Sequence, residues 1–439
     1  WKPSATWFYT YDQAYNLTSS HAAARTAADA GRFLPGTQGF ETAKKQIVST
    51  PIGQGAGAKF NDKSNLYHYE GMYNFSNLLK KKLDVLAGAS YRRFNLHSEG
   101  TLFDDANGGI AIDEYGGYVQ VGKKLFEEKL KLSASGRYDK SQNFEGRVTP
   151  RVSAVYTVAR NNNLRVSYQT GFRNPTTQNQ YINLLAGRTR LVGGLPALLD
   201  KYELRTTKPA YTAASVKMYQ QSLNIADLQV YTFSDLKPET VQAYEIGYKG
   251  LLTNKLLIDV SYYYNSYDNF IVDLALVQPT SPGNLVNAQN FITTVNNPGK
   301  VDSHGAALGL DYKVGKFNLS GNVSYNNLLN TSSTFINDFN TPKIRFNVGV
   351  ASREITKNVS FNATYRWQDT FNWQSTFVQG DVPAFGTIDA QVSLRVPAYS
   401  SSIKIGGSNI LNKYYTTSYG NPEVGGMYYV SLTFDQFMR

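Results

Sequence analysis

The sequence predicts an all-β fold in which antiparallel strands cross a membrane as a transmembrane β-barrel. Three observations lead to this prediction. Apolar and polar residues alternate strictly, the alternating segments are about ten residues long, and short connections alternate with long ones. We count about sixteen strands, an even number, as bacterial barrels of this kind require.

The alternation separates two faces on each segment. In "EKLKLSASGRY", the apolar face carries Leu132 and the polar face carries Lys131. Later segments repeat this pattern, with Val323, Phe361 and Val392 on the apolar face and Asn322, Asn362 and Gln391 on the polar face. A soluble sandwich also alternates, but its strands are usually only about five or six residues long. We therefore expect lipid outside the apolar face and water or polar protein inside the polar face.

The connections differ in length on the two sides of the strands. Short ones such as "FEE", "RNNN", "LTN" and "VGK" alternate with long ones, which include residues 16–65, 139–147, 174–235 and 271–300. In outer-membrane barrels the long connections are extracellular, so a surface protease should cut near Gly193 or Asn284. The alanine-rich stretch "HAAARTAADAG" predicts a short helix inside the first long connection.

Composition excludes several classes of site. The formal charge is +11, but the longest basic run is "LKKK", so nucleic-acid binding is not expected. There is no cysteine and the four histidines lie far apart, so no metal site and no cofactor are predicted. No apolar run is long enough for a transmembrane helix. The 32 tyrosines suit the interfaces between a membrane and water.

Known catalytic motifs do not occur in the sequence. It contains neither G-x-S-x-G nor H-E-x-x-H, and no close pair of carboxylates points to hydrolysis, so the protein is not expected to be an enzyme. The stretch "FDDANGG" from Phe103 resembles part of a calcium-binding loop. It lacks the downstream glutamate that would complete the ligand set, and we interpret it as an ordinary outer loop.

Several segments resemble the TonB-dependent outer-membrane receptors. "GFRNPTT" from Gly171 resembles the GFR-x-P signature of that family, and "LKPETVQAYEIGYKG" from Leu236 resembles its L-x-PE…YE-x-G-x-K strand. "SNILNKYY" from Ser408 and "GGMYYVSLTF" from Gly425 resemble segments near the family's C-terminus. The matches follow the family's order over the latter two-thirds of the chain.

The resemblance implies a barrel of about twenty-two strands around an N-terminal plug. We expect residues 1–439 to be the C-terminal portion of such a receptor barrel, with the plug not in this chain. The plug would contact the TonB energy-coupling complex. We expect the last strand to present Tyr428, Val430, Leu432 and Phe434 to lipid, with residues 436–439 as a short extension.

Glu245 stands in the middle of an apolar and aromatic strand. The alternation points it into the lumen, and the resemblance implies that it pairs with arginines of the plug. Ala307 occupies the position of a second family glutamate, so a complete charge lock is not expected. The alternative is that Glu245 is a solvated lumen carboxylate. The arginines predicted on the same face are Arg92, Arg137, Arg151, Arg165, Arg173, Arg345, Arg366 and Arg395.

Two interpretations of these arginines remain open. In the first, they form a path for an anionic ligand or a positively charged surface that contacts the plug. In the second, they form structural ion pairs with lumen acids such as Asp259 and Asp389. The long connections supply further candidates for ligand contact. Trp373 and Phe371 could stack on a sugar, a peptide side chain or a chelate, or Trp373 belongs to the aromatic girdle at the headgroups. Arg188 and Arg190 are basic ligand candidates in another long connection.

Functions of different classes remain open. The first is an outer-membrane receptor for TonB-coupled active import of a scarce nutrient, whether a siderophore, a corrinoid, a glycan or a peptide, bound by extracellular loops and the lumen. The second is a passive diffusion porin of about sixteen strands. A third is surface adhesion by the long loops, for which no specific motif occurs. The expected partners are outer-membrane lipid, the TonB complex and a small nutrient ligand, with a surface lipoprotein as a further option. The sequence does not identify the substrate.

Overall fold

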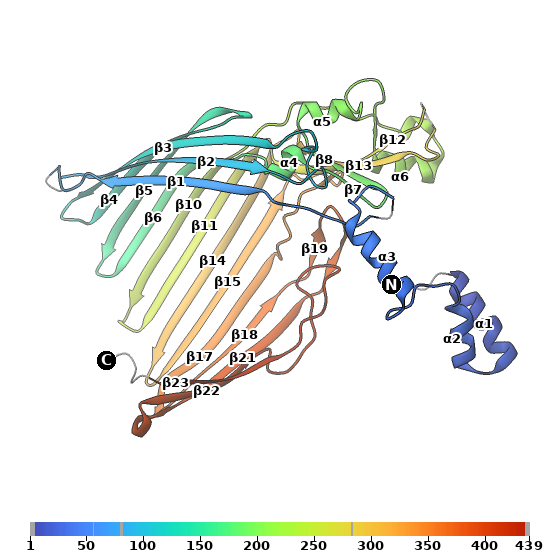
Figure 1. Cartoon of the computed structure of the whole chain (residues 1–439). Helices are drawn as coiled ribbons and strands as arrows, with labels where there is room; N and C mark the ends of the chain where they lie inside the picture. The colour runs from blue at the N-terminus through green and yellow to red at the C-terminus, as the bar shows by residue number, and fades with distance from the viewer. Residues whose placement is uncertain (1–4, 56, 80–81, 282–283, 435–439) are drawn as a thin grey trace.

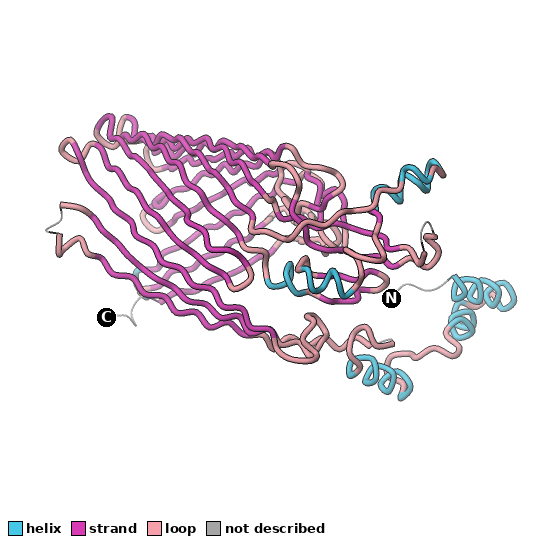
Figure 2. The backbone as a smooth tube through the Cα atoms, turned by 90° about the horizontal axis from the view of Figure 1, so that it is seen from above, coloured by secondary structure: helices cyan, strands magenta, loops and turns pink. Residues whose placement is uncertain are grey.

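One long antiparallel sheet dominates the molecule. The computed structural model describes residues 5–55, 57–79, 82–281 and 284–434. In this part of the chain fifteen strands pair in one sheet, which curves into a wall (Figure 1; Figure 2). In order across the sheet, the strands are β1 (Asn65–Asn74), β2 (Asp84–Leu96), β3 (Ile110–Leu125), β4 (Leu130–Ser141), β5 (Phe144–Ala159), β6 (Asn162–Arg173), β10 (Glu239–Leu252), β11 (Leu256–Asp268), β14 (Val301–Val314), β15 (Phe317–Leu329), β17 (Ile344–Thr356), β18 (Val359–Gln368), β21 (Phe385–Val396), β22 (Ser401–Ser408) and β23 (Met427–Phe434).

The predicted all-β class is confirmed, with fifteen strands in this sheet where about sixteen are predicted. β1 and β23 end the sheet and do not pair with each other among the described residues. β3 and β5 are the longest strands, with 16 residues each. A tilted strand crosses the hydrocarbon with about 9–11 residues, so these strands extend beyond it. Residues 436–439, the predicted extension, lie outside the described residues.

Tight turns join the strands at one end of the wall, as predicted. β10 and β11 are joined around Thr253 and Asn254, whose φ angles are 51° and 56°. Asn161, between β5 and β6, and Gly315, between β14 and β15, have φ angles of 62° and 55°. Positive φ angles let a very short connection match the right-handed twist of the two strands that it joins.

One predicted long connection is wrong. The sequence predicts an outer loop over residues 139–147, but β4 continues to Ser141 and β5 begins at Phe144. The two strands pair there with a register irregularity between Asp139 and Ser141. The polar composition of this stretch argues against a strand only within the bilayer, because there one face of a strand must be apolar. Beyond the bilayer both faces of a strand can contact water.

Three long connections at the opposite end fold together into a second sheet. The connection from β6 to β10 supplies β7 (Asn183–Ala186), β8 (Thr189–Val192) and β9 (Tyr211–Thr212). The connection from β11 to β14 supplies β12 (Ile271–Gln278) and β13 (Gln289–Asn296), and that from β15 to β17 supplies β16 (Phe335–Ile336). We call this sheet the cap, together with its helices α4 (Thr177–Tyr181), α5 (Pro196–Lys201), α6 (Ala213–Ser222) and η1 (Ile225–Asp227). It lies at one end of the wall (Figure 1).

The cap has a hydrophobic core of its own. Five of its side chains have at most 2% of their surface exposed: Val192, Leu199, Leu274, Leu276 and Phe291. The same cluster also includes Leu198 from α5 and Phe335 from β16. Burial of these side chains stabilises the cap by roughly 1.5–3 kcal/mol each. Three connections far apart in the sequence are therefore one packed structure rather than three separate loops.

The expected protease sites differ in accessibility. Asn284 is exposed, as the prediction requires. Gly193 is buried, and a Cβ atom there would lie 2.1 Å from the carbonyl oxygen of Gln180, so of the two expected positions Asn284 is the accessible one. The remaining described elements outside the N-terminal segment are a hairpin of β19 (Phe371–Gln374) and β20 (Gln379–Val382), and η2 (Pro397–Tyr399).

The N-terminal segment is helical. It contains α1 (Ala5–Thr18), α2 (His21–Ala28) and α3 (Gln38–Ser49), which extend away from the wall (Figure 1; Figure 2). α2 confirms the predicted short helix, and the Ser20 side chain caps it by accepting a hydrogen bond from the Ala23 N–H group. The predicted connection starts at residue 16, whereas the helical segment already begins at Ala5.

The two faces of the wall separate as the alternation predicts. Val323 lies opposite Leu308 and Phe346 on the neighbouring strands, and Phe361 lies opposite Val392. Many apolar side chains are exposed on this face, among them Leu132, Val323, Val392, Ile405 and Val430. An exposed apolar surface that continues over the strands of a whole sheet suits contact with lipid. On the opposite face, Asn322 accepts a hydrogen bond from Asn347 at 2.9 Å.

Candidate functional site

Arg165 on β6 joins carboxylates from two neighbouring strands. Its Nε lies 3.1 Å from Glu245 Oε1 on β10, and its Nη1 lies 2.9 Å from Asp259 Oδ1 on β11. Lys249 Nζ lies 3.3 Å from Asp259 Oδ2. Arg165 is directly opposite Gly247, where a Cβ atom would lie 2.7 Å from the guanidinium carbon. Glycine at this position therefore leaves room for the arginine.

These four side chains lie on the polar face of the wall. Two are positive, Arg165 and Lys249, and two are negative, Glu245 and Asp259, so their charges cancel. The sequence offers two interpretations of Glu245, pairing with plug arginines or solvation in the lumen. The structure adds a contact that neither includes, an ion pair with Arg165 within the wall. The role toward a plug stays a prediction. Ala307, at the expected position of a second acid, lies opposite Ser261 on β11, and the same strand supplies Asp259 to the network.

We expect a weak energetic coupling between Arg165 and Glu245. The two side chains are 33% and 45% exposed, so water screens their attraction. A double-mutant cycle with Arg165→Gln and Glu245→Gln should give a coupling of about 0.2–1 kcal/mol. The measurement is the unfolding free energy of the four proteins in phospholipid vesicles. A coupling well above about 2 kcal/mol would mean that the pair is far less hydrated than this exposure indicates.

Arg173 and Glu239 fix the base of the cap. Arg173 ends β6 and Glu239 begins β10, and Arg173 Nη2 lies 2.8 Å from Glu239 Oε2. The same carboxylate oxygen accepts a hydrogen bond from the Ile271 N–H group at 2.9 Å, at the start of β12. Glu239 is buried, so it holds three elements together where they leave the wall. The sequence treats Glu239 only as part of a motif, and its place directly after a long connection is the feature that could have identified it.

The other predicted lumen arginines differ in their partners. Arg366 on β18 forms an ion pair with Asp389 on β21. Asp389 also accepts hydrogen bonds from the Ser408 hydroxyl and the Asn409 N–H group, both at 2.9 Å. Arg345 and Arg395 are exposed, and neither forms an ion pair with an acid in the described part of the chain. The structure thus brings Arg165 together with Glu245, and leaves Arg345 and Arg395 apart from them.

The predicted ligand-contact residues lie in two separate places. Arg190 on β8 lies over the Tyr202 ring, 5.1 Å from its centroid, and donates to Asn183 Oδ1 at 3.0 Å. These contacts within the cap occupy its guanidinium, whereas Arg188 is exposed. Phe371 and Trp373 lie on β19, with ring centroids 6.5 Å apart. Phe371 lines a cavity of about 470 Å³ together with polar side chains of the neighbouring connections.

A cavity of about 540 Å³ lies where the cap meets the wall. Arg173 and Glu239 line it, and Asp273 and Asp338 reach it from the connections. Burial raises the pKa of Asp273, although hydrogen bonds from Thr294 and Thr376 act in the opposite direction. Partial desolvation and then the neighbouring Asp273 carboxylate raise the pKa of Asp338 to about 6. Two carboxylates near each other, with Arg173 already paired, therefore hold protons more tightly than usual.

The stability of the cap should depend on Asp338 between pH 4 and pH 6. Its pKa rises from 3.8 to about 6 on folding, so the folded protein binds the proton more tightly than the unfolded chain. The stabilisation is present below about pH 4 and is lost as the pH rises through about 6. Hydrogen exchange of the cap amides should show this slope, and Asp338→Asn should flatten it. An unchanged slope in that variant would assign the dependence to another group.

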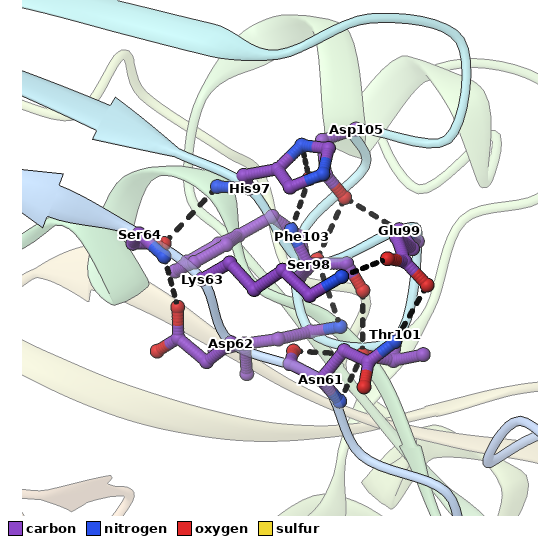
Figure 3. Close-up of polar contacts among 12 residues, drawn as sticks. Asn61, Asp62, Lys63, Ser64, His97, Ser98, Glu99, Thr101, Phe103 and Asp105 are labelled. Atoms are coloured by element: carbon purple, nitrogen blue, oxygen red, sulfur yellow. Dashed lines mark hydrogen bonds and ion pairs between the residues drawn. The ribbon is translucent and has the colours of Figure 1, made fainter.

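The connection between β2 and β3 is fixed by a buried carboxylate. Asp105 accepts hydrogen bonds from the Ser98 N–H group, from Ser98 Oγ at 2.6 Å and from the Gly100 N–H group at 2.7 Å. Burial alone would raise the pKa of Asp105, but these hydrogen bonds outweigh it and hold the pKa below its usual value. Thr101 Oγ1, in turn, accepts a hydrogen bond from the Asn61 N–H group at 2.9 Å (Figure 3). The expectation of an ordinary outer loop fits these contacts.

A surface ion pair completes this arrangement. Glu99 accepts hydrogen bonds from Lys63 Nζ at 2.7 Å and from Asn61 Nδ2 at 2.6 Å (Figure 3). The Lys63 ammonium group holds the pKa of Glu99 below its usual value. The segment that enters β1 is therefore attached to the connection that follows β2. Among the described residues no group of three or more His, Asp or Glu side chains is arranged to hold a metal ion. Within the same residues no helix is long and apolar enough to cross a bilayer.

A polar face with paired charges, an apolar face suited to lipid, and long connections packed at one end define the wall of a membrane β-barrel receptor or channel. Comparison with protein families identifies the family to which the chain belongs. The family model described as TonB dependent receptor-like, beta-barrel, matches residues 1–412. The chain belongs to this family of TonB-dependent outer-membrane receptors, and the resemblance noted in the sequence is confirmed. A comparison with curated protein sequences finds no match.

Solved structures with a similar fold include two siderophore receptors and an iron transporter. The siderophore receptor PirA from Acinetobacter baumannii has a TM-score of 0.57 and 13% identity, with 84% of this chain and 54% of that chain covered. The FrpB iron transporter from Neisseria meningitidis has a TM-score of 0.57 and 12% identity, with 84% and 55% covered. A variant of the ferric enterobactin receptor PfeA from Pseudomonas aeruginosa has a TM-score of 0.57 and 15% identity, with 84% and 53% covered. The chain spans about half the length of these structures, and at such identity the likeness shows the fold.

Proposed function

We propose that this chain is part of the wall of an outer-membrane receptor that imports a scarce nutrient with energy from the TonB complex. The family match over residues 1–412 carries the proposal. The cap supports the proposal as well. Packed outer connections with a cavity beneath them are better suited to capturing a ligand than to letting solutes diffuse freely. In this proposal the protein acts as a receptor and not as an enzyme.

The expected partners follow from the two faces of the wall. Lipid contacts the apolar face, and a plug domain supplied outside residues 1–439 contacts the polar face near Glu245 and Arg165. The plug transmits the pull of the TonB complex. The ligand is a small nutrient. A siderophore, a corrinoid, a glycan and a peptide all remain candidates, because the ligands named for the structural neighbours belong to those neighbours and not to this chain. A surface lipoprotein is a further partner that the cap could bind.

The test compares uptake with and without energy coupling. Cells that express the complete protein receive a labelled iron chelate, a corrinoid, an oligosaccharide and an oligopeptide in separate assays. Uptake of one class should require the protein and should stop when the TonB gene is deleted. Uptake that continues unchanged without TonB would favour the passive porin. The absence of protein-dependent uptake for every class would contradict import.

A further inference from the structure

We infer that the polar face of β2 and β3 carries a binding site for a zwitterionic ligand, an α-amino acid or the end of a short peptide. The site is a cavity of about 390 Å³ under the segment that leads into α4. Arg92 and Glu114 both line it, and they supply one positive and one negative group. The inference deepens the proposed function and rests on it for the fate of the ligand, since import would carry the bound molecule inward.

Arg92 and Glu114 are direct neighbours that do not pair with each other. They lie opposite each other in the register of β2 and β3. Direct cross-strand partners have Cβ atoms about 4.5–5.5 Å apart, close enough for an ion pair between such long side chains. None forms, and the Arg92 guanidinium has no hydrogen bond or ion pair among the described residues. Glu114 accepts one hydrogen bond, from Asn174 Nδ2 to its Oε1 at 3.0 Å.

The other charged side chains beside the cavity have partners of their own. Lys140, which also lines it, donates through Nζ to the Phe144 carbonyl oxygen at 2.7 Å. Arg137 binds the Asp139 carboxylate through Nε at 2.7 Å to Oδ2 and through Nη2 at 2.5 Å to Oδ1. This pair lies over Gly116, where a Cβ atom would be 2.1 Å from Asp139 Oδ1. Glycine therefore permits the pair to form the floor of the cavity. The guanidinium of Arg92 and the second carboxylate oxygen of Glu114 have no hydrogen-bond partner among the described residues and can contact a ligand.

The rest of the cavity is firmly built. Phe94 and Ile112 form the next cross-strand pair on the same face and offer an apolar wall. Gln180 is buried beside the cavity, donates to the Pro175 carbonyl at 2.6 Å and accepts from Asn143 Nδ2 at 2.6 Å. The volume is within the range of roughly 300–1,000 Å³ typical of small-molecule sites. A carboxylate on Arg92, an ammonium group on Glu114 and an apolar side chain on Phe94 would together fill it.

Charge pairing selects this ligand class over a simple anion or cation. A ligand with only a carboxylate would meet Glu114 as a like charge, and a ligand with only an ammonium group would meet Arg92. A zwitterion meets an opposite charge at each position. Charge-assisted hydrogen bonds of this kind are stronger than neutral ones, and bidentate contact with a carboxylate suits arginine.

The test uses three probes of the same shape. Phenylalanine carries both charges, hydrocinnamate lacks the ammonium group, and phenethylamine lacks the carboxylate. Calorimetric titration of the complete protein in nanodiscs should show phenylalanine binding about tenfold or more tightly than either analogue. Arg92→Gln should remove the advantage of phenylalanine over phenethylamine. Glu114→Gln should remove its advantage over hydrocinnamate. The control Arg151→Gln removes an exposed arginine from the same face of β5 and should leave all three affinities unchanged.

The outcomes separate this inference from the proposed function. Equal binding of the three probes, no binding of phenylalanine, or an equal loss in the control variant would each overturn the zwitterion site. Selective binding of phenylalanine by a protein that shows no TonB-dependent uptake would support the site and contradict import. TonB-dependent uptake of another nutrient, without phenylalanine binding, would support import and overturn the site.

Discussion

Placing an arginine at Val392 should destabilise the membrane-embedded protein by about 2–4 kcal/mol, whereas an arginine at Asn362 should have a much smaller effect. Val392 lies on the apolar face between Phe361 and Ile405 in the register of β18, β21 and β22. Asn362 lies on the polar face, opposite Gln391. A charge on the first face must enter hydrocarbon, and a charge on the second face remains in contact with water or polar protein.

The two positions make a matched pair. They sit on neighbouring strands and differ by one residue in register, so depth in the bilayer is nearly equal and only the face changes. The measurement is the unfolding free energy of Val392→Arg and Asn362→Arg by denaturant titration in phospholipid vesicles. Equal destabilisation by the two substitutions would contradict the assignment of lipid and lumen faces.

Replacing Asp105 with alanine should open the connection between β2 and β3. The substitution leaves the Ser98 N–H group, the Ser98 hydroxyl and the Gly100 N–H group without their acceptor. A buried donor that loses its partner costs about 1–3 kcal/mol, so the local free energy of opening should fall by about 3 kcal/mol or more. Hydrogen exchange of the amides in residues 97–105 reports this change.

Asp104 provides the control for this experiment. It is exposed and pairs with Lys201 on the surface, so Asp104→Ala should change stability by about 0–1 kcal/mol. The two substitutions remove the same group from adjacent residues. If they accelerated exchange to the same extent, the hydrogen bonds of Asp105 would not be what fixes this connection.

The faces of the wall could be predicted because they depend on local chemistry. A strand turns each side chain through half a turn, so the assignment of Val323 and Asn322 to opposite faces needs only their places in the sequence. The turns follow equally local rules, as Asn254 and Gly315 adopt the positive φ angles that tight hairpins require. Arg165 and Glu245 were predicted on one face, and the register then brings them into contact.

The N-terminal helix shows where a local pattern has two solutions. In residues 5–18 the aromatic residues could belong to a strand or to a helix. In α1, Trp7, Tyr11 and Tyr15 recur every four residues and stack along one side, with ring centroids 5.2 Å and 6.3 Å apart. Side chains four residues apart are neighbours on a helix, and this pairing favours the helix over the strand.

Alternation in the sequence by itself determined the strand class, the two faces and the end that carries the tight turns, because each depends on residues within one strand or one hairpin. Only the tertiary structure decided that three outer connections form one cap, that Glu239 joins Arg173 to the Ile271 N–H group, and that Arg92 and Glu114 share a cavity without pairing. These features arise from contacts between segments separated by tens of residues. Such contacts depend on the register and curvature of the whole sheet, which no local pattern of residues contains.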